Sequence, residues 1–135
     1  MSHDADLEIL GFDNVLFPVG DLAEAVTFYE RVGFPVKVRI DEAGIALLAA
    51  GKETPGLLLR AEDGFEHRPP GWPTTRLWLE VPDARAAADG LRAGGIELLD
   101  APFSTSTGHV VEFADPWGNV VGLTDYLKRP ELARN

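Results

Sequence analysis

The chain has 135 residues, of which 45% are hydrophobic and 25% charged, a length and composition typical of one folded globular domain and unlike those of a disordered chain. It has no cysteine, which excludes disulfides, thiolate metal sites and a cysteine nucleophile, and its formal net charge of −10 argues against nucleic-acid binding, which depends on clustered basic residues. With no apolar run of the roughly 18 residues that a membrane span needs, and with acidic rather than basic residues near its start, the chain is expected to act in the cytoplasm.

The first elements predicted along the chain are a strand and a helix. An apolar run that starts at Asn14 ends in Val19, Gly20 and Asp21. A carboxylate at such a position accepts hydrogen bonds from the unpaired backbone N–H groups of a helix start, so Asp21 should begin a helix. Apolar residues then recur at helical spacing, and Gly33 follows as the residue that turns the chain out of the helix.

Three extended segments are expected after this helix. They are FPVKVRI, GIALLAA and GLLLRA, and residues that favour turns separate them. The next stretch, 62–73, contains three prolines and two glycines, so it is predicted to be a linker. The order of this half is therefore one strand, one helix and three strands.

The second half of the chain repeats the first. Segment 14–36 aligns without gaps on segment 76–98, at a constant offset of 62 residues. Asp83 takes the place of the first helix cap and Gly95 that of the closing glycine, which predicts a second helix between them. The segments IELLD, HVVEF and NVVGLTDY are the three strands expected to follow.

The repeat divides the single domain into two modules. We expect them to cover about 8–61 and about 74–127, with boundaries that are good to a few residues. Residues 1–6 and the tail 128–135 have no clear period, and both are expected to be poorly ordered unless a partner holds them.

Two groups of residues resemble a known family. The first runs from Val19-Gly20-Asp21-Leu22 through Ala25–Glu30 to Gly33-Phe34, and the second is Phe113–Asn119, which contains Asp-Pro-Trp-Gly-Asn. Over nearly the whole chain, the sequence resembles the vicinal oxygen chelate superfamily of glyoxalases, bleomycin-resistance proteins and extradiol dioxygenases. The resemblance implies an α+β fold, in which two βαβββ modules form a curved mixed sheet or open barrel around a cavity. The second group consists of turn residues between apolar strands, so its first role is expected to be structural.

The same resemblance bears on metal binding. Superfamily members that use a divalent metal place His, Gln or Glu at four equivalent points, in the first and last strand of each module. These points fall on Asn14, Leu58, Arg76 and Gly122. Leucine and glycine have no side-chain donor and arginine repels a cation, so we expect no metal and no cofactor. The chain is closest in type to the metal-free members that resemble bleomycin-resistance proteins.

The histidines offer one other route to a metal. His3, His67 and His109 lie in the N-terminal tail, the linker and the second module. His109 and Glu112 have a spacing found in metal sites, but residues three apart in a regular strand face opposite sides of the sheet. A bulge or a shifted register would bring the two side chains together.

A cavity-facing set follows from strand alternation. If Arg76 faces inward, then Trp78 and Glu80 face inward with it. An arginine there can bind a carboxylate or phosphate, and a tryptophan can stack on a flat or cationic ligand. The other interpretation is that Arg76 and Glu80 pair with each other or lie in solvent while Trp78 fills the core. The remaining predicted ligand-binding residues are Asn14, Leu58, Arg60, Trp117 and Gly122, and Trp72 and Trp117 are both expected to be exposed aromatics.

Two functions of different classes remain. The first is a metal-independent binding protein that holds or sequesters a small aromatic or charged molecule, a drug or a metabolite; the resemblance implies that it forms a homodimer. The second is a glyoxalase-like lyase or isomerase, or a dioxygenase-like enzyme, with metal ligands not recognised in the sequence or with Glu80 or Glu112 as acid or base. Because the four points lack the usual metal ligands, we expect the first.

Overall fold

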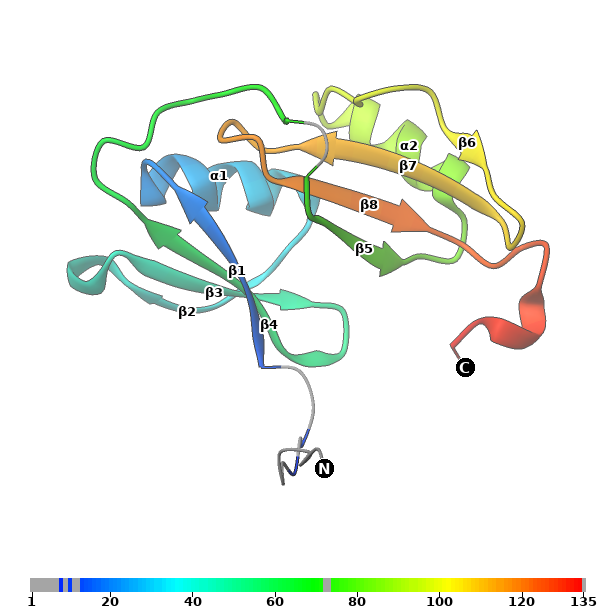
Figure 1. Cartoon of the computed structure of the whole chain (residues 1–135), viewed down its shortest axis with the longest axis horizontal. Coiled ribbons are helices and arrows are strands. Elements are labelled where there is room, and N and C mark those ends of the chain that lie inside the picture. Colours follow the sequence, from blue (N-terminus) through cyan, green and yellow to red (C-terminus); the bar gives the residue numbers. More distant parts are fainter. Residues whose placement is uncertain (1–7, 9, 11–12, 72–73, 135) are drawn as a thin grey trace, which may run out of the picture.

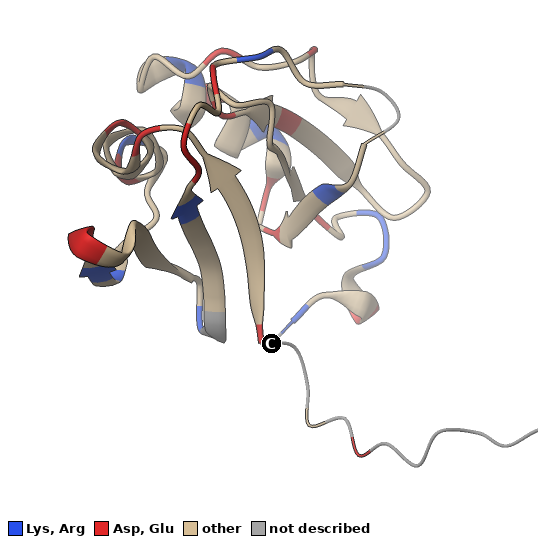
Figure 2. Ribbon diagram, turned by 60° about the vertical axis from the view of Figure 1, so that its left-hand side comes forward, with Lys and Arg blue, Asp and Glu red and all other residues tan. Residues whose placement is uncertain are grey.

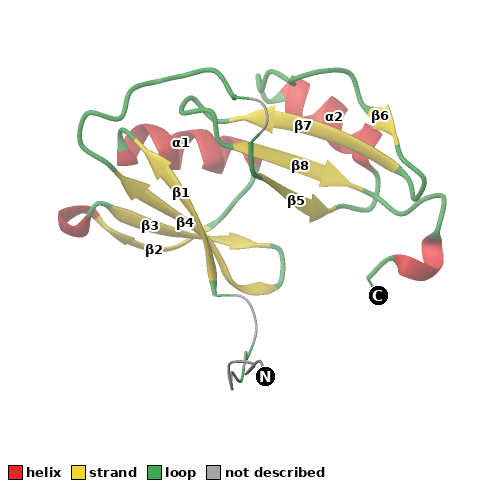
Figure 3. Cartoon of the chain, in the orientation of Figure 1, coloured by secondary structure: helices red, strands yellow, loops and turns green. Residues whose placement is uncertain are grey.

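A computed structural model describes residues 8, 10, 13–71 and 74–134, so the predictions on His3, Trp72 and the segment 1–6 lie outside the described residues. Two βαβββ modules lie next to each other (Figures 1 and 3). The first module contains β1 (Asn14–Val19), α1 (Leu22–Val32), β2 (Val36–Ile40), the short 3₁₀ turn η1 (Asp41–Ala43), β3 (Ile45–Ala50) and β4 (Glu53–Ala61). The second contains β5 (Arg76–Glu80), α2 (Ala84–Ala93), β6 (Phe103–Ser104), β7 (His109–Ala114), β8 (Val120–Thr124) and the turn η2 (Pro130–Leu132).

Both helices begin and end as the sequence predicts. The Asp21 carboxylate accepts from the backbone N–H of Glu24 at 2.9 Å, and the Asp83 carboxylate accepts from two N–H groups of α2. Gly33 and Gly95 follow the helices with φ of 116° and 79°, a left-handed conformation that favours glycine. Neither of these helices is long and apolar enough to cross a membrane, within the described part of the chain.

The strands form two four-stranded mixed sheets with one topology. Sheet A has the order β1-β4-β3-β2 and sheet B the order β5-β8-β7-β6. In each sheet the first strand of the module runs parallel to the last, and the other pairs are antiparallel. The predicted α+β fold of two modules is therefore confirmed, and the sheets stay open rather than closing into a barrel.

The second module departs from the prediction at IELLD. This segment forms no strand; it makes one isolated bridge, from Leu98 to Phe113, and the paired edge strand is β6, a few residues later. The interruption has a local cause. The Asp100 side chain accepts from the N–H of Ala101 at 2.8 Å, and Pro102 has no N–H to donate to a neighbouring strand.

The C-terminal segment also differs from the expectation of disorder. The Lys128 ammonium donates to the Ser104 hydroxyl and, at 2.9 Å, to the Thr105 carbonyl. Farther along, Arg134 is hydrogen-bonded to Glu80 in β5. Hydrogen bonds from the Lys128 and Arg134 side chains therefore hold this segment against sheet B, although no periodic pattern marks it in the sequence.

One hydrophobic core joins the two modules. It lies between the helices and the sheet faces that they cover, and it includes the side chains of Tyr29 from the first module and Phe113 from the second. The turn that follows β7 carries a buried carboxylate, Asp115, which accepts from the Tyr29 hydroxyl at 2.8 Å and from the Asn119 amide at 2.7 Å. The Asn119 amide also donates to the carbonyl of Pro18 in β1. The predicted structural role of this turn is thus to tie the modules together.

The same turn corrects one prediction. Trp117 is not an exposed aromatic, because only 2% of it is accessible and it packs edge-on against His67 at a centroid distance of 5.1 Å. A side chain buried in the core offers no face to a ligand. Trp117 is therefore withdrawn from the ligand-binding set.

Candidate functional site

The second module turns a row of polar and aromatic side chains away from the core. In β5, Leu77 and Leu79 pack against the hydrophobic core, so the alternate residues Arg76, Trp78 and Glu80 lie on the opposite face. Trp78 is 45% exposed and does not fill the core. The alternation predicted for these three residues is therefore present, and the alternative in which Trp78 fills the core is not.

Glu112 in β7 is the centre of this face. Its carboxylate accepts from the Arg76 guanidinium at 2.8 Å and from the Trp78 indole N–H at 2.9 Å. The Arg76 and Glu112 side chains are only 21% and 12% exposed, so water competes weakly for this ion pair. The pair fixes the guanidinium and the edge of the indole ring in one position.

Gly122 explains how Trp78 reaches across the sheet. The β8 residue Gly122 is paired with Trp78 on one side and with Glu112 on the other. A Cβ at this position would stand 2.4 Å from the indole Cδ1, closer than real atoms approach. Glycine therefore lets the ring lie over β8 and donate to β7.

The matching face of the first module is apolar. There Leu16, Leu58 and Leu47 occupy the places that Trp78, Gly122 and Glu112 hold in the second. Asn14 is exposed at the start of β1. Arg60, at the other end of its strand, forms an exposed ion pair with Glu62 at 3.0 Å. The two modules share a backbone plan, but only the second carries charges at its centre.

A cavity of about 620 Å³ lies between the modules beside Trp78. Trp78, Leu79 and Glu80 of β5 line one side, and the end of α1 with Phe34 and the β3–β4 turn with Lys52 line the other. The predicted ligand residues Asn14, Leu58, Arg60, Arg76 and Gly122 are not in its lining. This volume falls within the range of about 300–1,000 Å³ that is usual for small-molecule pockets.

Glu80 is held by the C-terminal segment. Its two carboxylate oxygens accept from the backbone N–H of Arg134 at 2.9 Å and from the guanidinium of Arg134 at 3.0 Å. The Glu80 side chain is 16% exposed and the Arg134 side chain is 69% exposed. The carboxylate therefore belongs to the cavity wall, whereas the guanidinium lies mostly in solvent.

These residues do not fit a divalent metal of the family type. Of the four equivalent points, Leu58 and Gly122 have no donor, and Arg76 places a cation where the metal would lie. Across the described residues, no group of three or more His, Asp or Glu side chains could hold a metal ion. Glu112 is already bound to Arg76 and Trp78.

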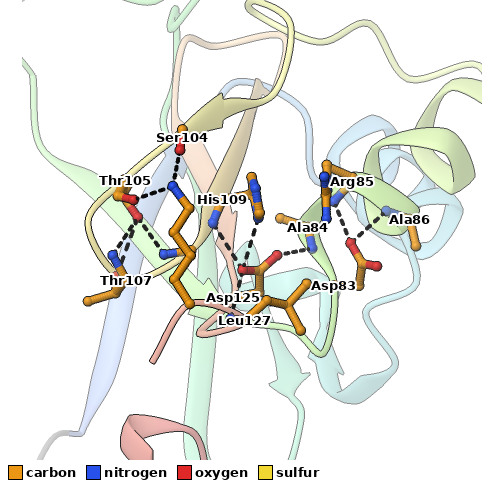
Figure 4. A network of polar contacts seen from close by, with 12 residues as sticks. Asp83, Ala84, Arg85, Ala86, Ser104, Thr105, Thr107, His109, Asp125 and Leu127 are labelled. Atoms are coloured by element: carbon orange, nitrogen blue, oxygen red, sulfur yellow. Dashed lines mark hydrogen bonds and ion pairs between the residues drawn. The ribbon is translucent and has the colours of Figure 1, made fainter. Parts of the chain in front are cut away.

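His109 belongs to a different network, around Asp125 (Figure 4). The buried Asp125 carboxylate accepts backbone N–H groups from Ala84 at the start of α2, from His109 and from Leu127. Burial alone would raise the pKa of Asp125, but these three donors and the nearby His109 ring together hold the pKa below its usual value. The His109 ring lies 3.5 Å from Asp125, and Glu112 faces the site instead, as expected for residues three apart in a strand.

Sequence reasoning missed three features of this region. It did not pair Glu112 with Arg76, it did not single out Asp125, and it gave Arg134 no role. The first had a usable signal, since strand pairing would have placed Glu112 next to Gly122 and so on the face of Trp78. The other two depend on where the chain runs after β8, which no pattern in the sequence indicates.

The comparisons with known proteins agree with this architecture. A crystal structure of a glyoxalase/dioxygenase from Nostoc punctiforme matches with a TM-score of 0.70 and 18% identity, over 93% of this chain and 97% of that one. A glyoxalase/bleomycin resistance protein/dioxygenase from Nocardioides matches with a TM-score of 0.69 and 20% identity, over 96% and 91%. A lactoylglutathione lyase from Agrobacterium tumefaciens matches with a TM-score of 0.66 and 16% identity, over 87% and 94%.

At these identities the structural likeness shows the fold alone. No curated protein matches the chain significantly. The model of one family, described as the Glyoxalase/Bleomycin resistance protein/Dioxygenase superfamily, matches residues 11–123. The match spans both modules and the Asp115 turn that ties them together, so the chain belongs to this superfamily.

Proposed function

We propose that the protein binds a small planar molecule in the cavity beside Trp78, without a metal, and holds it rather than converting it. One observation carries the proposal. The centre of the second module, where the family's metal-dependent members have ligands, is instead an Arg76–Glu112 ion pair that positions a 45% exposed indole beside a cavity of about 620 Å³.

The exposed indole indicates the shape of the ligand. The Trp78 ring is fixed at its N–H by Glu112 and backed by β8 at Gly122, so little rotamer freedom remains to be lost when a flat molecule stacks on its open face. Phe103 lies near it, at a ring-centroid distance of 6.4 Å. A planar aromatic ligand makes the best use of such a surface.

The proposal is tested with three probes that share one ring and differ in charge: benzamide, benzoate and benzamidine. Binding is followed by calorimetry and by the NMR resonance of the Trp78 indole N–H. We expect at least one probe to bind with equal affinity in the presence and absence of EDTA. Trp78→Ala should weaken that binding by about tenfold, which corresponds to about 1.4 kcal/mol of lost stacking and burial.

The repeat supplies the control. Leu16 holds the place of Trp78 in the first module and is also exposed, so Leu16→Ala should leave the affinity unchanged. Equal losses in the two variants would contradict the assigned site. Stoichiometric metal in the purified protein, or turnover of a glyoxalase-type or dioxygenase-type substrate, would move the enzyme alternative ahead.

We include the homodimer and the cytoplasmic location in this proposal. Val38 and Ile40 leave an exposed apolar face on sheet A, which supports a contact with a second copy. Sedimentation equilibrium tests the homodimer, and a monomer at all protein concentrations would contradict it.

A further inference from the structure

The C-terminal segment places a cation at the cavity beside Trp78. Arg134 and Trp78 both line that cavity, and the Arg134 guanidinium is bound to Glu80, which lies two residues from Trp78 on the same face of β5. Successive same-face residues of a strand stand about 7 Å apart. A planar cation and an open aromatic surface are therefore neighbours within one site.

The Glu80 carboxylate is part of the site, whereas the Arg134 guanidinium that binds it is easily displaced. At 16% exposure Glu80 has lost most of its water, so a cationic partner is worth more to it than to a solvated carboxylate. Arg134 keeps 69% of its side chain exposed, and ion pairs made by such exposed groups add little stability. Lys52, on the opposite rim of the cavity, is exposed to solvent.

The segment that carries Arg134 packs loosely on the sheet. A second cavity of about 400 Å³ lies beneath it, between Val81 and Pro82 on one side and Leu127 and Pro130 on the other. Leu127 and Leu132 are 46% and 53% exposed. Because its apolar side chains are not buried, moving this segment exposes little new apolar surface and costs little free energy.

We infer that the Arg134 guanidinium occupies the position at which a cationic group of the ligand binds. The segment Pro130–Arg134 therefore competes with a planar organic cation for Glu80. This inference rests on the proposed function and adds to it the charge of the ligand. Its ring stacks on Trp78 while an amidinium or guanidinium group replaces that of Arg134 at the carboxylate, where it can form the same pair of hydrogen bonds.

The test compares benzamidine with its neutral counterpart benzamide, at constant ionic strength, in the full-length protein and its variants. Arg134→Ala should bind benzamidine up to about fivefold more tightly, the factor expected when an exposed ion pair no longer has to be displaced. Its affinity for benzamide should not change. Glu80→Gln should abolish the preference for benzamidine over benzamide.

Arg129→Ala is the matched control. Arg129 lies directly before this segment, carries the same charge as Arg134 and pairs with Glu131, so its loss should leave both affinities as they are. A deletion of residues 130–135 also removes the backbone N–H that Arg134 donates to Glu80. It should tighten benzamidine binding at least as much as Arg134→Ala does.

Four results would overturn the inference. Equal benzamidine affinities in Arg134→Ala and Arg129→Ala would show that there is no competition. If Arg134→Ala tightens the binding of benzamide and benzamidine equally, the substitution has opened the cavity in general and has not made Glu80 available to a cation. If benzamide binding depends on Trp78 but benzamidine binds no more tightly than benzamide, the inference is overturned and the proposed function remains. If no probe binds to any variant, both the inference and the proposed function are overturned.

Discussion

At the scale of single residues, the Arg76–Glu112 pair is expected to contribute to stability. Glu112→Ala leaves the guanidinium of Arg76 largely buried without the carboxylate at 2.8 Å and also removes the acceptor of the Trp78 indole. We expect a loss of about 2 kcal/mol in the free energy of unfolding, measured by urea denaturation. Glu131→Ala, which breaks an exposed pair with Arg129, should change it by less than about 0.5 kcal/mol.

The first module indicates how the pair can be replaced. Asn14 and Leu47 stand there in place of Arg76 and Glu112. The double variant Arg76→Asn with Glu112→Leu removes both charges together, so it should regain most of the stability lost in Glu112→Ala. If the double variant is less stable than the single one, the cost does not come from removing the Glu112 carboxylate from beside Arg76.

At the scale of elements, Asp125 joins the end of β8 to the starts of α2 and β7 (Figure 4). Its folded-state pKa is lowered. The stabilisation that the ionised Asp125 carboxylate gives the folded state is therefore complete above the unfolded-state pKa of about 3.9. It is lost as the pH falls through the folded-state pKa. Asp125→Asn turns one acceptor oxygen into a donor and should cost about 2 kcal/mol at pH 7.

Denaturation of the wild type and Asp125→Asn at pH 7 and at pH 3 measures this effect. The difference in unfolding free energy between the two proteins should shrink at the lower pH. The reason is that pH 3 lies below the unfolded-state pKa of about 3.9, so the unfolded wild type binds a proton that the folded carboxylate, with its lowered pKa, binds less readily. A difference that is the same at both pH values would show that the charge of Asp125 does not contribute.

The elements that the sequence predicts well are those with local causes. Asp21 and Asp83 cap helices through N–H groups of the next turn, and Gly33 and Gly95 close them, so each signal lies within a few residues of its effect. IELLD has the composition of a strand, but Asp100 and Pro102 interrupt its pairing. That outcome depends on the neighbouring strand β7, which composition does not describe.

The candidate site is harder to predict because its contacts join distant parts of the chain. Arg76 and Glu112 are 36 residues apart, and Glu80 and Arg134 are 54 apart. Alternation predicts the face of Arg76, Trp78 and Glu80 but not their partners. Glu112 follows from the order of strands in sheet B, whereas Arg134 follows from the path of the chain after β8. Trp117 was misjudged for the same reason: a turn residue is usually exposed, but this turn is buried against the linker near His67.

At the scale of the whole molecule, basic and acidic residues are spread over both modules rather than gathered on separate faces (Figure 2). The modules are joined instead by the core and by the buried Asp115 carboxylate. Burial raises the pKa of Asp115, and the donors from Asn119, Tyr29 and Trp117 oppose that shift. One of those donors, the Tyr29 hydroxyl, comes from the other module, so unfolding of the first module would take a donor from this buried group.

This dependence predicts that the two sheets unfold together. In native-state hydrogen exchange, the slowest amides of β4 and β8 should report the same free energy of opening, and Tyr29→Phe should lower both by about 1–3 kcal/mol, the cost of taking one donor from a buried carboxylate. Tyr126→Phe removes a hydroxyl from the segment after β8 and should leave both values unchanged. A loss confined to sheet A would show instead that the modules are separate folding units and that Asp115 keeps enough donors from its own turn.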